Sequence, residues 1–236
     1  MTETLFEFRQ RTQGFSANSL PGVGAFGTNP GLTVKVDDNG RMKPYVGNTM
    51  VFLLTEECKV RLSCIQEELY YCCGEMLADR LHPDTFHMTL HDLVNGVPGL
   101  GLWKEARIAA EEAELLLEQL RAKYTEPVHM RSTWLFNMVN TSVVLGLEPA
   151  DEASCFLLMT LYEHFEKIVR LGYKMTPHIT LAYYKPGVYG DAQRGALQKV
   201  FERVSRQEKM MFELPVDSLE LLWFDDMNQY IGRNNT

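Results

Sequence analysis

Two short stretches of the chain share one pattern, His87-Met88-Thr89-Leu90 and His178-Ile179-Thr180-Leu181. They stand 91 residues apart (178 − 87), and each lies in a run where apolar and polar side chains alternate. A period of two is typical of a β-strand, in which residues two apart point to the same side. The pattern therefore predicts that the histidine and the threonine of each stretch share one strand face.

A second repeat precedes each of these stretches. Residues 49–56 and 141–148 both read T-x-V-x-L-x-x-E and stand 92 residues apart (141 − 49). Their β-branched and apolar composition predicts strands. The apolar stripes of 58–76 and 155–169 that follow have the period of a helix. Two independent patterns thus indicate one internal duplication.

The remaining elements of each half follow the same order. Helices are expected over 109–124 and 197–204, and closing strands over 128–138 and 212–224. Each half then runs β-α-β-α-β. We expect an α+β, internally duplicated, two-lobed fold, in which each lobe is an antiparallel sheet with outer helices and a central cleft separates the lobes.

The domain boundaries follow from the same patterns. Residues 47–236 are expected to form a single domain with lobes at about 47–138 and 139–236, which can exchange strands. Residues 1–46 differ, with a Gly-rich loop followed by an expected hairpin over 32–46 around an Asn-Gly turn. This N-terminal arm either packs on the domain or covers an active site.

Composition limits the classes of function. The chain has 236 residues, 45% hydrophobic, and a net charge of −8. This charge disfavours long duplex nucleic acid as a partner. No apolar run is long enough for a membrane span, and no secretory signal is visible. Five cysteines without a C-x-x-C pair are expected to be reduced thiols, as in a cytoplasmic protein. We expect a monomer.

The paired motifs suit a phosphodiester. If a pseudo-twofold axis relates the halves, the two His-Thr faces oppose each other. One imidazole can then accept a proton while the other donates one, near neutral pH. The threonine hydroxyls can donate hydrogen bonds to the non-bridging phosphoryl oxygens. This chemistry needs no metal and no cofactor.

At these residues the chain resembles the two-histidine (2H) phosphoesterase superfamily, whose signature is two H-x-[ST]-x motifs in a duplicated bilobal fold. The resemblance covers about 49–230, and the N-terminal arm is similar to an uncharacterised bacterial branch. It implies that His87, Thr89, His178 and Thr180 carry catalysis on cyclic phosphates or 2′-5′ phosphodiesters of small nucleotides or RNA ends.

Four further residues are weaker candidates for substrate binding. Strict alternation puts His91 on the face of His87, and Tyr184 on the face of His178, where each either touches substrate or packs at the rim. Trp134 and Tyr45 are additional aromatic candidates. His87 and His91 also match HxxxH, but on a strand they are separated by about 13 Å, too far for one ion.

The leading hypothesis is therefore a metal-independent phosphodiesterase acting on a small nucleotide or an RNA-terminal phosphate. The alternative is a protein of the same fold that senses a nucleotide without turning it over. An enzyme that processes or ligates long RNA is disfavoured by the charge and by the lack of a basic run.

Overall fold

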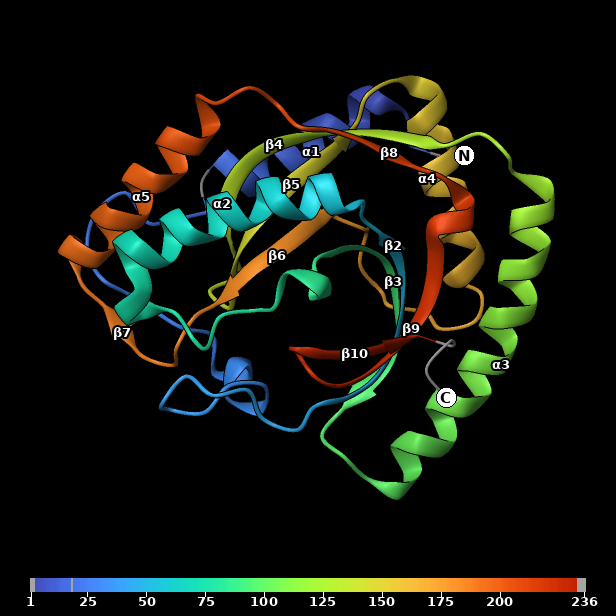
Figure 1. Cartoon of the computed structure of the whole chain (residues 1–236), viewed down its shortest axis with the longest axis horizontal. Coiled ribbons are helices and arrows are strands. Elements are labelled where there is room, and N and C mark those ends of the chain that lie inside the picture. The colour runs from blue at the N-terminus through green and yellow to red at the C-terminus, as the bar shows by residue number, and fades with distance from the viewer. Residues whose placement is uncertain (1–2, 18, 233–236) are drawn as a thin grey trace.

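Two four-stranded antiparallel sheets meet through their edge strands β3 and β6 near the middle of the molecule (Figure 1). The structure is a computed structural model that describes residues 3–17 and 19–232. Residues 1, 2 and 18 of the expected arm, and residues 233–236, lie outside the described residues.

In each sheet, neighbouring strands are joined by backbone hydrogen bonds in one unbroken order. The first has the order β10-β9-β2-β3, with bounds Gln229–Gly232, Leu219–Asp226, Val46–Leu53 and His87–Gly96. The second has the order β6-β5-β4-β8, with bounds His178–Tyr183, Ser142–Pro149, Val128–Met138 and Met211–Leu214. A two-stranded pair joins β1 of the arm to β7, with bounds Phe26–Gly27 and Val188–Tyr189.

The two sequence halves exchange their third strands. β4 ends the first half but pairs with β5, the first strand of the second half. β9 belongs to the second half but pairs with β2, the first strand of the first half. Both sheets therefore contain strands from both halves, and the strands that carry the two motifs occupy equivalent edges.

Helices cover the outside of the sheets. α2 (Glu56–Cys73) packs beside α5 (Asp191–Ser205), which contacts β4, whereas α3 (Leu100–Lys123) covers β2, β3 and β9 (Figure 1). α4 (Glu152–Phe165) contacts both sheets, and α1 (Leu5–Ala17) contacts α4 and β4.

Side-chain caps mark where two of these helices begin. The Thr55 side chain accepts a hydrogen bond from the backbone N–H of Cys58 at the start of α2. Asp151 accepts one from Ser154 at the start of α4. Each cap satisfies one of the backbone donors that a helix leaves free in its first turn.

Two sequence expectations differ from the structure. The hairpin over 32–46 is reduced to one bridge between Val36 and Met42, preceded by the short 3-10 helix Pro30–Val34. The expected strand over 212–224 is broken at Pro215, where the chain crosses from β8 in one sheet to β9 in the other. Proline donates no backbone hydrogen bond and favours such a break.

One hydrophobic cluster connects the arm, both sheets and the helices. Leu32 and Val36 of the arm are fully buried in it, beside core residues of both lobes. Among the described ranges, no helix is both long and apolar enough for a membrane crossing. The internally duplicated α+β fold with two antiparallel sheets is confirmed.

Candidate active site

The two motifs line one cavity of about 170 Å³ at the junction of the sheets. Strand β3 contributes His87 and Thr89, and strand β6 contributes His178 and Thr180. The other lining residues come from the arm, the strands and the loops between them: Lys35, Tyr45, Thr49, Leu81, Thr85, Asp92, Asn95, Tyr183, Phe224, Met227 and Tyr230. Residues 91 positions apart in sequence are thus brought to one small space.

Each histidine is fixed by a backbone group two residues earlier. Nδ1 of His178 lies 2.7 Å from the carbonyl oxygen of Thr176. His87 makes the corresponding hydrogen bond to the backbone of Thr85. A ring nitrogen that donates to a carbonyl leaves the other nitrogen free to act in the cavity. The repeated T-x-H-x-T pattern of the sequence is therefore a longer signal than H-x-T, and the sequence reasoning missed it.

Burial disfavours the charged form of both imidazoles. It lowers the pKa of His87 to about 4, with the neighbouring His178 lowering it further and the Thr85 backbone and Asp92 opposing it. Burial also lowers the pKa of His178. Removing a cation from water disfavours its charged form. Both side chains can therefore accept a proton at neutral pH.

A β-bulge follows the threonine in each motif. The pairing of β3 with β2 skips Leu90, and the pairing of β6 with β5 skips Leu181. The two bulged residues are 91 positions apart (181 − 90), so the bulge belongs to the duplication. An extra residue shifts every later side chain to the opposite face of its strand.

The bulges bring two residues into the cavity that strict alternation excludes. Asp92 lines it from β3 and accepts a hydrogen bond from the hydroxyl of Thr49 at 3.3 Å. Tyr183 lines it from β6, and its hydroxyl lies 3.2 Å from Sδ of Met227. Burial raises the pKa of Tyr183, so its phenol stays protonated. The sequence reasoning missed both residues because nothing in the local sequence marks a bulge.

The expectation that His91 shares the face of His87 is wrong. Its side chain is fully buried on the other side of β3, where Nε2 lies 3.2 Å from Oε1 of Glu166. Its ring packs on Tyr162 with centroids 5.2 Å apart. Burial lowers the pKa of His91, and the Glu166 carboxylate opposes the shift. His91 therefore does not line the histidine cavity but is one of the buried residues that line the cavity adjoining it.

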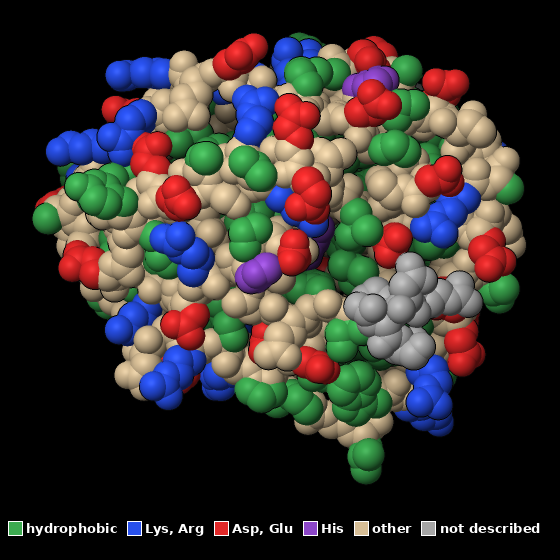
Figure 2. All heavy atoms as spheres, viewed as in Figure 1, with side chains coloured by type: hydrophobic (Ala, Val, Ile, Leu, Met, Phe, Trp, Pro, Cys, Tyr) green, Lys and Arg blue, Asp and Glu red, His purple; other side chains and the backbone are tan. Residues whose placement is uncertain are grey.

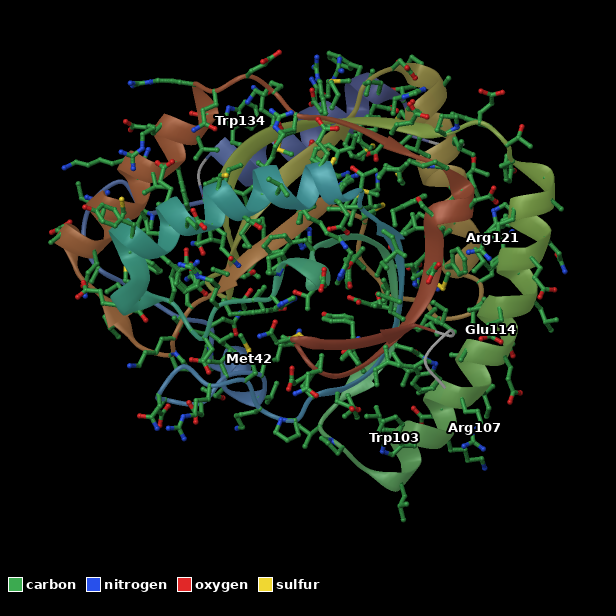
Figure 3. All side chains as sticks on the ribbon, in the orientation of Figure 1. Met42, Trp103, Arg107, Glu114, Arg121 and Trp134 are labelled. Carbon is green, nitrogen blue, oxygen red and sulfur yellow. The ribbon has the colours of Figure 1, made fainter. Side chains whose placement is uncertain are left out.

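The expectations for two aromatic candidates are also wrong. Tyr184 is fully buried behind β6 and packs edge-on against Phe26 of the arm, with centroids 5.7 Å apart. Trp134 is an exposed residue of β4 (Figure 3) and lines a different cavity. The third candidate, Tyr45, does line the histidine cavity and stacks on Phe224.

A second cavity of about 460 Å³ adjoins the first. The two share Thr89, Asp92 and His178, while the outer wall of the second is mainly apolar and includes Met138, Val139, Leu171 and Met175. Val139 has a φ of 42°, a conformation that costs a β-branched residue energy. The second cavity therefore extends the histidine cavity into a mainly apolar space.

The side chains that could bind a metal ion form no candidate centre in the part of the chain that the structure describes. No group of three or more His, Cys, Asp or Glu side chains is placed there to hold an ion.

The fold has counterparts among solved structures. One is a conserved protein of unknown function from Agrobacterium tumefaciens, with a TM-score of 0.64 and 17% identity over 88% of this chain and 92% of that one. TT0787 of Thermus thermophilus gives a TM-score of 0.49 and 16% identity over 79% and 94% of the two chains. Escherichia coli LigT gives 0.36 and 16% over 80% and 95%.

No protein-family model matches the chain, and no curated protein does. The likeness to the Agrobacterium protein therefore bears on architecture. The chain has the duplicated, two-lobed α+β fold that its resemblance to the two-histidine phosphoesterases implied.

Proposed function

We propose that the protein is a metal-independent phosphodiesterase of the two-histidine type. It hydrolyses a cyclic phosphate or a 2′-5′ phosphodiester of a small nucleotide or RNA end. The observation that carries this proposal is the meeting of both H-x-T pairs in one cavity. Two imidazoles and two hydroxyls around one space are the groups that an in-line displacement at phosphorus uses.

The reaction needs one histidine in each protonation state. One of His87 and His178 accepts a proton from water or from the attacking hydroxyl, while the other donates a proton to the leaving oxygen. Burial lowers the pKa of both and so favours their neutral forms. A bound phosphodiester adds a negative charge, which favours protonation of one imidazole. Substrate binding thereby prepares the acid.

Hydroxyl groups supply the remaining contacts to phosphate. Thr89 and Thr180 stand beside their histidines and can donate to the non-bridging oxygens. The phenols of Tyr183 and Tyr230 are further donors, because burial raises the pKa of both. Hydrogen bonds that strengthen as charge develops lower the barrier.

A small substrate agrees with the size of the site and with the surface. The histidine cavity holds about 170 Å³, with the apolar cavity of about 460 Å³ beside it. Figure 2 shows acidic and basic side chains interspersed on the visible face. This mixed surface and the net charge of −8 favour a terminal or mononucleotide phosphate over a long polyanion.

The test is turnover of 2′,3′-cyclic mononucleotides and 2′-5′ dinucleotides in the presence of a chelator. We expect His87→Ala and His178→Ala each to lower kcat/KM by at least about 100-fold, the usual worth of acid–base catalysis. The control is His129→Ala, which removes an exposed histidine of β4 that does not line the cavity. It should turn over like the wild type.

Three results would contradict the proposal. Turnover that disappears with chelator would contradict a metal-free mechanism, and turnover that survives loss of either histidine would contradict their roles. Binding of a panel member without turnover would favour the alternative, a nucleotide sensor of the same fold.

A further inference from the structure

The N-terminal arm contributes a lysine to the histidine cavity. Lys35 follows the short 3-10 helix and lines the cavity together with Tyr45, the last residue of the arm before β2. Its Nζ lies 4.7 Å from the centre of the Tyr45 ring. The lysine and the two motifs thus come from three separate parts of the sequence.

The backbone around Lys35 is held firmly against the body. Leu32 and Val36, on either side, are fully buried. The backbone N–H of Asp79 donates to the carbonyl of Gly40 at 2.7 Å. The backbone N–H of Tyr45 donates to Asp225 at 3.0 Å. These anchors fix the backbone of Lys35 at the wall of the cavity, so that binding a ligand has to order only its side chain.

Charge makes Lys35 distinctive within the cavity. Among the described lining residues, Lys35 is the only Lys or Arg and Asp92 the only Asp or Glu. Burial lowers the pKa of His87 and His178 and so disfavours a positive charge on either imidazole. Burial also lowers the pKa of Lys35 from a much higher ordinary value, and the nearby Asp92 carboxylate opposes that shift. Without Lys35 the cavity would hold a carboxylate and no cation, which repels an anionic phosphodiester.

From this charge balance we infer that Lys35 of the N-terminal arm is the cation that binds the substrate phosphate. The inference rests on the proposed function, since it assigns a residue to that same site. It also gives the arm a role: the arm is a fixed wall of the active site that completes its charge. Lys35 offsets the charge of Asp92, so that one imidazole protonated on binding leaves the site with the positive charge that a phosphodiester monoanion needs.

The experiment compares Lys35→Met, Lys35→Arg and the wild type in binding of inorganic phosphate, measured by titration calorimetry. We expect Lys35→Met to weaken binding by about 10- to 100-fold, the usual worth of a hydrogen bond to a charged group. Lys35→Arg keeps the charge and should retain most of the affinity. For a panel substrate, Lys35→Met should raise KM more than it lowers kcat.

The matched control is Lys43→Met in the same arm. The Nζ of Lys43 donates to the carbonyl of Thr33 at 2.6 Å on the exposed side, and the residue does not line the cavity. This variant should bind phosphate like the wild type. Thermal unfolding of all variants shows whether a loss of binding reflects a loss of fold. If Lys35→Met does not fold, the Lys35→Arg variant still tests the assignment.

The outcomes separate this inference from the proposed function. If the wild type turns over a panel substrate and folded Lys35→Met binds phosphate equally well, the assignment of Lys35 is overturned while the activity stands. Weak phosphate binding by folded Lys35→Arg, or no binding by the wild type, also overturns it. If no substrate is turned over but phosphate binding depends on Lys35, the assignment stands and the proposed activity fails.

Discussion

The two histidines occupy matching environments within the repeated T-x-H-x-T pattern. Each follows a threonine whose backbone binds the imidazole, and each is followed two residues later by a threonine in the cavity. The surroundings are unequal in one respect, because Tyr230 packs against His87 with centroids 4.9 Å apart. Because the two motifs are equivalent, the side chains around each histidine set its pKa and thereby determine which of the two becomes the acid.

The lowered pKa of His87 predicts how stability depends on pH. The unfolded chain binds a proton on this residue below its ordinary value of 6.5, but the folded chain does so only near pH 4. Protonation therefore favours unfolding, and the free energy of unfolding should fall as pH is lowered through that window. Urea denaturation at several pH values measures the effect, and His87→Gln should show a smaller decrease than the wild type.

The carboxylates and other histidines titrate in both proteins, so the difference between the two curves isolates His87. Parallel curves from pH 7 to pH 4 would contradict the lowered pKa of His87.

At the scale of single elements, the bulges at Leu90 and Leu181 determine which side chains reach the substrate. Without them, strict alternation would place His91 and Ala182 at the cavity and turn Asp92 and Tyr183 away. Bulges are frequent next to active sites, where they redirect a side chain. Here a bulge follows the motif threonine in each half.

The bulge in β6 predicts opposite results for two adjacent tyrosines. Tyr184 is fully buried, and its hydroxyl has no hydrogen-bond partner among the described residues. Tyr184→Phe should therefore keep full turnover and raise the free energy of unfolding by about 1 kcal/mol. Tyr183→Phe removes a hydroxyl from the cavity and should lower kcat/KM by up to about tenfold.

Steady-state kinetics and urea denaturation on both variants check this pair. The reverse pattern, with Tyr184→Phe impaired and Tyr183→Phe normal, would mean that β6 continues without a bulge.

At the scale of the whole molecule, strand exchange makes the site a joint product of both halves. β4 and β9 each pair with the opposite half, and one hydrophobic cluster extends across the molecule. Neither half can complete a sheet alone. The relative position of β3 and β6, and hence the distance between the histidines, depends on the complete fold.

This exchange predicts that the two sheets unfold together. Trp103 and Trp223 stack beside the first sheet with centroids 6.2 Å apart, while Trp134 belongs to the second sheet and lies far from Trp103 (Figure 3). In Trp134→Phe the fluorescence reports the first sheet, and in the Trp103→Phe/Trp223→Phe variant it reports the second. Within each variant, the urea midpoint from fluorescence should equal that from far-UV circular dichroism.

Because the two midpoints are compared within one variant, a change in stability caused by the substitution shifts both and does not affect the comparison. Separate midpoints would show that the lobes unfold independently, against the exchanged pairing.

The sequence by itself determined the duplication, most of the helices and strands, and the faces of the four motif residues. It could do so because periodicity of apolar residues follows directly from backbone geometry. It also led to Tyr45, which does line the cavity. Local patterns contain this information because it concerns neighbours along the chain.

Tertiary structure alone decided the remaining features of the site. The bulges replace His91 and Tyr184 with Asp92 and Tyr183, the strand exchange brings β3 beside β6, and the arm delivers Lys35. These features depend on pairing between segments far apart in sequence, and on burial, which lowers the pKa of both histidines. A one-residue shift in strand pairing has no local sequence signature, yet it changes which charges face the substrate.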